Sequence, residues 1–317
     1  MNISKVKILT LILFLIFFKN NLYAETKMKI VAKIGDEIIT NFDIENKIKT
    51  NLFLSGEEIN QQNVDKIKSF TLKSLVNLKL KNNEIKKHNI NTNELAISQY
   101  INTVTNNLNM SEMDLMIKFK AYGIDYNQFL KDIETEFLWQ RLVAKIYLER
   151  IKVNEDQINF ELNQILKNKK KNNISEEFNL SEIEVLFENS NEETQLINKI
   201  SDEIKKNGFE KTAIKFSTSS TSLTGGQLGW INSNQLTTDI YNNIKDLQEG
   251  QFSKPLKKGN TITFLKLNKK KISNIKKDVN IDKLKINLEN SKKNELLNLY
   301  SNSHLSKIKN ITLIEFL

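Results

Sequence analysis

Two glycine-containing motifs in the second half of the chain restrict its fold more than any other feature of the sequence. Residues 225–230 read GGQLGW, and residues 247–256 read LQEGQFSKPL. Paired glycines allow backbone conformations that other residues avoid, and a Gly-x-x-Ser-x-Pro turn is suited to start a hairpin. The two motifs therefore predict tight turns between the short elements of a compact domain.

The apolar pattern around these motifs predicts which elements the turns connect. We expect a strand at residues 180–187, helices at 192–206, 209–216 and 238–247, and strands at 254–256 and 261–267. Residues 217–229 are rich in Ser, Thr and Gly and are predicted to form a loop. The order β-α-α-α-β-β predicts a compact α+β domain.

The first half of the chain predicts a hairpin followed by helices. Residues 30–39 alternate in hydrophobicity around a Gly-Asp pair that suits a two-residue hairpin turn. Thr40 and Asp43 have the spacing of a capping box, and from residue 41 to about residue 153 the apolar spacing is helical. Further helix starts are predicted at Asn93, Ser111 and Asp125.

The tail predicts a helix from Asp282 to about Ser303 and a strand at residues 311–316. Because a lone strand needs a partner, we expect the two ends of the chain to pair and close the helical part around a small sheet. The polar run at residues 169–173 is the clearest linker. The predicted division is a leader (1–24), a helical N-terminal domain with a linker helix (25–173), the α+β domain (174–270), and a helix and strand that complete the N-terminal domain (271–317).

The leader predicts export from the cytoplasm. Lys5 and Lys7 precede an apolar run at residues 8–18, and residues 22–24 end in the small residue that a cleavage site needs. The apolar run is shorter than the ~20 residues of a membrane-spanning helix. We therefore expect cleavage after Ala24 and no membrane span afterwards. An uncleaved anchor is the alternative, since Leu22 suits the cleavage site less well than Ala would.

The composition excludes several kinds of site. The chain has no cysteine, which excludes a lipid-modified N-terminus, a disulfide and a zinc–thiolate site. Its two histidines, His88 and His304, are too few for a histidine-rich metal site, and we expect both to be exposed. No cofactor is expected, since the Gly-x-x-x-x-Gly-Lys loop of nucleotide-binding proteins is also missing. The net charge of +9 comes from scattered lysines, which indicates solvated faces and no nucleic-acid partner.

The glycine motifs, with the short helix that they enclose, resemble the pattern of the parvulin prolyl isomerases: GGDLGW, a helix, then L-x-x-G-x-x-S-x-P-V. Residues 31–40, 122–129 and 140–142 are similar to the N-terminal domain of the SurA chaperones. The resemblance covers nearly the whole mature chain and implies a mostly helical chaperone domain plus one parvulin α+β domain. It departs from the family in number, because SurA proteins carry two parvulin domains and this chain has room for one.

The resemblance also implies site residues. Leu228, Leu236 and Ile240 fall on the apolar positions that hold the proline ring. The two catalytic histidine positions fall on Glu182 and Thr261, and the Cys or Asp position falls on Ser219, so all three are substituted. Either these three form a substitute polar network around the twisted amide, or the fold persists for peptide binding with weak or lost isomerisation. We favour the second interpretation because the chemical type of two positions has changed.

Three functions stay open at this point. The favoured one is a periplasmic chaperone that binds unfolded outer-membrane β-barrel precursors, whose alternating strands expose apolar surface until they insert. This client class is implied by the family resemblance. The second is an active peptidyl-prolyl isomerase, and the third is a structural subunit of an envelope complex with neither activity.

Overall fold

The computed structural model describes residues 27–172, 174–274 and 280–317, so the predicted leader lies outside the described residues. The chain begins with the hairpin β1 (Ile30–Ile34) and β2 (Glu37–Thr40). Helices then follow: α2 (Asn41–Leu54), α3 (Gln61–Lys86), α4 (Glu94–Asn107), α5 (Glu112–Ala121), α6 (Tyr126–Tyr147), the 3-10 turn η1 (Leu148–Arg150) and α7 (Glu155–Asn172).

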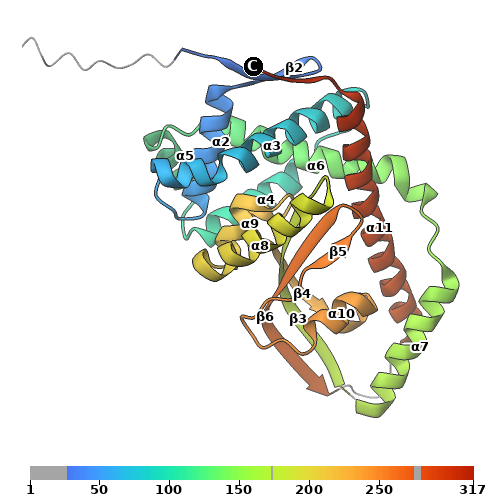
Figure 1. Ribbon diagram of the computed structural model, residues 1–317. Coiled ribbons are helices and arrows are strands. Elements are labelled where there is room, and N and C mark those ends of the chain that lie inside the picture. The colour runs from blue at the N-terminus through green and yellow to red at the C-terminus, as the bar shows by residue number, and fades with distance from the viewer. Residues whose placement is uncertain (1–26, 173, 275–279) are drawn as a thin grey trace, which may run out of the picture.

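The central domain contains β3 (Ile174–Leu186), α8 (Ser190–Asn207), α9 (Phe209–Phe216), η2 (Ser222–Thr224), β4 (Gln227–Asn232), η3 (Ser233–Gln235), α10 (Thr238–Ile244), β5 (Leu256–Lys258) and β6 (Thr261–Asn274). The chain ends with α11 (Ile281–Ile311) and β7 (Ile314–Phe316). Helices α2 to α6, α11 and strands β1, β2 and β7 are called the helical body below (Figure 1).

The two ends of the chain meet in a three-stranded sheet, as the sequence predicts. The strand order is β2-β1-β7, and β7 pairs antiparallel with β1 through Ile34 and Ile314 (Figure 1). Ala32, Ile34 and Ile39 bury one side of this sheet against the helices. The predicted architecture, a helical domain closed by strands from both ends plus an α+β domain, is therefore confirmed.

The boundaries of the tail elements differ from the prediction. Helix α11 runs to Ile311, beyond the predicted end near Ser303, and β7 is correspondingly short. Contacts with α6 explain the difference: the Trp139 indole donates to Ser301 Oγ at 2.8 Å, and Tyr147 contacts His304. Leu305 and Ile308 in the added turns are also buried in the main core, so tertiary packing extends the helix.

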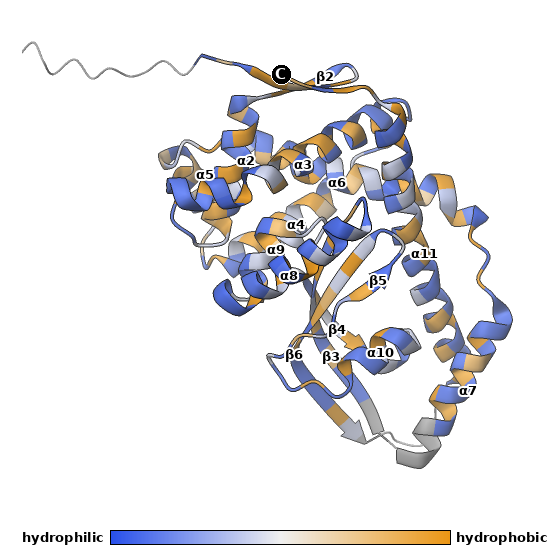
Figure 2. Cartoon of the chain, viewed as in Figure 1, coloured by the Kyte–Doolittle hydropathy of each residue, from blue (hydrophilic) through white to orange (hydrophobic). Residues whose placement is uncertain are grey.

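The predicted helix starts are confirmed by side-chain caps. Thr40 with Asp43, and Ser111 with Asp114, form capping boxes, while Asn93 and Asp125 each accept a backbone N–H from the first turn. Hydrophobic and hydrophilic residues alternate along these helices (Figure 2). This pattern is typical of helices that pack one side against a core.

The central sheet contains a strand that the sequence analysis placed in a loop. The strand order is β4-β3-β6-β5, all antiparallel, and β4 overlaps the predicted loop at residues 217–229. Pairing with β3 holds β4 in place although it contains Gly229. Gly226, just before β4, has a φ of 78°, and an added Cβ would lie 2.0 Å from the Glu182 carbonyl oxygen. This close approach requires glycine.

The two faces of the central sheet have different partners. Ile183, Val185, Ile262 and Phe264 share a core with α8, α9 and the helical body. Residues on the opposite face form a second cluster with the segment around α10, including Leu180, Leu265, Leu267 and Ile244. The central domain is therefore packed against the helical body. The domain boundaries at residues 173 and 270 stay predictions.

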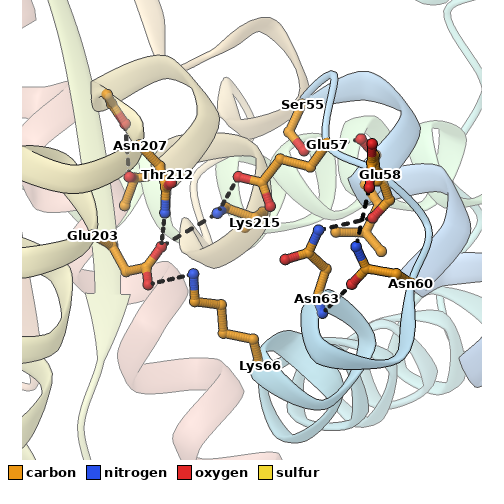
Figure 3. A network of polar contacts seen from close by, with 12 residues as sticks. Ser55, Glu57, Glu58, Asn60, Asn63, Lys66, Glu203, Asn207, Thr212 and Lys215 are labelled. Carbon is orange, nitrogen blue, oxygen red and sulfur yellow. Dashed lines mark hydrogen bonds and ion pairs between the residues drawn. The ribbon is translucent and has the colours of Figure 1, made fainter.

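A buried ionic network joins the two parts (Figure 3). The Lys215 side chain on α9 has no exposed surface, and its Nζ lies 2.6 Å from Glu57 and 3.3 Å from Glu203. Lys66 on α3 lies 3.1 Å from Glu203, so positive and negative groups alternate across the interface. Of the helices in the described part of the chain, none is long and apolar enough to cross a membrane.

Candidate functional site

Strand β3 and the loop after α9 bring together two of the three predicted polar site residues. Ser219 Oγ donates to Glu182 Oε1 at 2.6 Å. Thr221, which the sequence analysis did not single out, donates to the same oxygen at 3.1 Å, and its hydroxyl lies 3.0 Å from that of Ser219. Glu182 is therefore held by two hydroxyl groups of one short loop.

Thr261 is not part of this cluster. It begins β6 opposite Leu186, four residues along β3 from Glu182, which corresponds to roughly 13 Å at the usual rise of a strand. Its hydroxyl accepts a hydrogen bond of 2.8 Å from Asn302 on α11. The structure thus separates the third predicted residue from the other two.

A second carboxyl group, Glu184, lies beside Glu182 and was missed from the sequence. Residues two apart in a strand share a face, so two glutamates at i and i+2 that alternate with the apolar Ile183 and Val185 were the available signal. Its cross-strand partner is Thr263, and its backbone N–H and C=O bond to Ser217 Oγ and to the Thr218 N–H.

Burial changes the acidity of both carboxyl groups. It raises the pKa of Glu182, although the hydrogen bonds from Ser219 and Thr221 act in the opposite direction. Burial, reinforced by the neighbouring negative charge of Glu182, raises the pKa of Glu184 to about 8. A protonated carboxyl group is a hydrogen-bond donor as well as an acceptor, so this pair can offer donors at Glu184 and at Glu182, where the resemblance implies a histidine.

The three predicted proline-pocket residues lie in one apolar cluster. Leu228 from β4, Leu236 after η3 and Ile240 from α10 pack with the β3 and β6 side chains of the second sheet face. Leu236 is only 6% exposed. The structure therefore assembles the predicted pocket residues, and they lie on the face of the sheet opposite to α8 and α9.

A cavity of about 440 Å³ lies between the helical body and the central domain. Its walls mix apolar side chains from α3 and α6, such as Phe70 and Phe137, with polar groups such as Ser74 and Gln140. Residues of the loop that carries Ser219 form another wall. Helix α4 fixes this loop, since the Tyr100 hydroxyl donates to the Ser220 carbonyl at 2.8 Å.

Neither histidine belongs to this site, but the prediction that both are exposed was wrong for His304. Its side chain is 12% exposed and contacts Tyr147 and Trp139. The reason is the extended α11, which carries His304 against α6. Among the described residues, no group of three or more His, Cys, Asp or Glu side chains is arranged to hold a metal ion.

Comparisons with known proteins agree with this geometry. Residues 178–269 match the family model described as Rotamase, PPIC-type PPIase domain. Chaperone SurA of Methylobacillus flagellatus is 26% identical over 249 residues, which cover 75% of this chain and 56% of that protein. Chaperone SurA of Pectobacterium atrosepticum is 25% identical over 276 residues, which cover 82% of this chain and 62% of that protein. The chain thus spans somewhat less than two thirds of these relatives.

Among solved structures, one comes from work on PEB4 and the periplasmic protein Cj1289 of Campylobacter jejuni, described as two structurally related SurA-like chaperones. The two chains are 16% identical, the match covers 91% of the present chain and 98% of the other, and the TM-score is 0.34.

Proposed function

Since the chain is a SurA-like protein with one PpiC-type parvulin domain, distantly related to the SurA chaperones over most of its length, we propose that it is a periplasmic folding chaperone. Its clients are unfolded outer-membrane β-barrel precursors. The client class is what the resemblance to the SurA chaperones implies, and the predicted leader supports the location. The parvulin domain has weak or no isomerase activity.

The observation that carries the proposal is the cavity between the helical body and the parvulin domain. Unfolded β-barrel precursors offer alternating apolar side chains and unpaired backbone amides. The cavity presents both kinds of partner, with Phe70 and Phe137 beside Ser74 and Gln140. Its volume of about 440 Å³ lies in the range of ligand pockets and suits a short stretch of extended polypeptide.

The weak isomerase activity is supported by the polar residues of the parvulin site. An imidazole is replaced by a carboxyl group at Glu182, and Thr261 bonds to Asn302 instead of joining Glu182 and Ser219. The preorganised polar set around the amide, which is the main source of rate acceleration in such sites, is therefore divided between two places.

Aggregation of an unfolded β-barrel protein, followed by light scattering, tests the proposal. Ser74→Phe fills the cavity from α3, whereas Ser69→Phe adds the same ring at an exposed position of the same helix. We expect Ser74→Phe to lose most of the suppression and Ser69→Phe to keep it. Equal suppression by both folded variants contradicts binding in the cavity.

An active isomerase is the second candidate, favoured by the assembly of Leu228, Leu236 and Ile240 in one cluster. A proline-peptide isomerisation assay separates it from the first. We expect a rate close to the uncatalysed one. A rate clearly above background that falls in Ile240→Ala and in Glu182→Gln assigns the enzymatic function instead.

A further inference from the structure

Both histidines of the chain lie against one carboxylate of the helical body. His88 Nε2 lies 3.7 Å from Glu84 Oε1, and His304 Nε2 lies 3.4 Å from the same oxygen. Glu84 lies in the last turn of α3 and His88 in the bend just after this helix, whereas His304 comes from α11, at the other end of the sequence. A single carboxylate thus faces two imidazoles, one from the bend after α3 and one from α11.

The environment of His304 fits an imidazole that gains a proton. Its Nδ1 lies 2.7 Å from the Tyr147 hydroxyl, and its ring contacts Trp139 at a centroid distance of 5.5 Å. Its Nε2 is buried and has no hydrogen-bond partner among the described residues. The charged ring carries N–H on both nitrogens, one directed to the Tyr147 oxygen and the other facing the Glu84 carboxylate.

We infer that Glu84, His88 and His304 form a proton-sensitive clasp that holds α11 on α3 and α6, with His304 as its main switch. Protonation of His304 places a cation beside the Glu84 carboxylate at low exposure, where charges interact more strongly than in water. The clasp is therefore tighter in mildly acidic than in alkaline medium. This inference does not depend on the identity of the client.

Other charged and titratable groups face the clasp from α3 and from the α6 side. Lys87, the C-cap of α3, lies 2.8 Å from Glu84 Oε2, and Lys81 on α3 lies over the Trp139 ring. Burial raises the pKa of Glu84, but Lys87 and His304 outweigh it and hold that pKa below the ordinary value, so the carboxylate stays ionised.

On the α6 side, burial raises the pKa of Tyr147, even though the nearby Arg150 opposes this, so the phenol stays neutral. Tyr300 on α11 stacks on Tyr147 with a centroid distance of 4.8 Å. Histidine is the residue type whose charge ordinarily changes between about pH 5 and 8. The proposed switch therefore uses a residue type whose charge can change in this range, beside a Glu84 carboxylate that stays ionised.

The clasp affects more than the helix that carries His304. Helix α11 continues into β7, which pairs with β1, and its Ser291 hydroxyl donates to the Gln235 carbonyl at the rim of the parvulin domain. Loosening α11 weakens both connections. Medium pH thereby controls how firmly the closed body and the parvulin domain are held together.

Hydrogen exchange of the mature protein, corrected for the intrinsic pH dependence of exchange, tests this inference. In the wild type we expect α11 to lose about tenfold more protection than α5, which is far from both histidines in sequence, between about pH 5.5 and 8. Glu84→Gln and His304→Gln should each remove most of this pH dependence, and the double variant should remove no more than either single variant. His88→Gln should remove only a small part of it. Equal pH responses of α11 and α5 in the wild type, or additive effects in the double variant, overturn the clasp.

The wild type alone provides a second measurement if the variants fold poorly. With only two histidines, their ring resonances can be followed by NMR through the same pH series. We expect the His304 ring to titrate together with the loss of protection in α11. Titration of His304 without any change in α11 also overturns the inference.

Discussion

At the scale of single residues, the carboxyl pair on β3 makes the protein sensitive to pH. Because burial and the neighbouring Glu182 raise the pKa of Glu184 to about 8, the folded state holds a proton that the unfolded chain releases near pH 4.3. The contribution of Glu184 to stability must then fall as pH rises from about 4.5 to about 8. We expect Glu184→Gln to flatten this fall and to be more stable than the wild type at about pH 8, on the order of 2 kcal/mol, by urea unfolding.

The matched control is Glu177→Gln on the same strand, where the side chain is not part of the carboxyl pair. It should leave the pH profile of stability unchanged. A Glu184→Gln variant whose pH profile equals that of the wild type contradicts the assignment of a retained proton to this pair.

The sequence predicted part of this site for a clear reason. Glu182 and Ser219 follow from motif spacing, which fixes a position on a strand and a position on a loop. Thr221 and Glu184 were missed because their role depends on how the loop after α9 folds back over β3, which no local pattern specifies. The burial of His304 was missed for a related reason, since it depends on α6 packing against α11.

At the scale of elements, α9 is fixed to the helical body by the buried Lys215. Lys215→Met leaves Glu57 without its buried cation and Glu203 with Lys66 alone, in a site where the two carboxyl side chains are only 12% and 10% exposed. We expect a loss of about 3–5 kcal/mol in the free energy of unfolding, as for other broken buried ion pairs. Chemical denaturation measures it directly.

Lys73→Met provides the control for this prediction. Lys73 also bridges the helical body and the central domain, through Glu192, but its side chain is 58% exposed. Its loss should be below about 1 kcal/mol. Similar losses for the two lysines contradict the role given to the buried network.

Element boundaries were predictable where local chemistry decides them. The caps at Thr40, Asn93, Ser111 and Asp125 lie where the sequence places them, because capping needs only a side chain and the next turn. Strand β4 was not predictable in this way, since its order comes from pairing with a strand some fifty residues earlier.

At the scale of the whole molecule, the pairing of the two chain ends closes the helical body. Ile314 on β7 packs against the main core, whereas Phe316 on the same strand is exposed. We expect Ile314→Ala to lower the free energy of unfolding by roughly 2 kcal/mol and to increase hydrogen exchange in β1. Phe316→Ala should change stability by less than ~1 kcal/mol; the reverse order contradicts this account of closure.

The closed body and the docked parvulin domain together form the cavity, so the central claim concerns what enters it. A photo-crosslinking residue placed at Ser74, and in a matched variant at Ser69 on the same helix, reports this directly with an unfolded β-barrel protein. The account predicts severalfold more crosslinking from position 74 than from position 69, and little from either to the folded barrel. Equal crosslinking from both positions, or more from position 69, contradicts it.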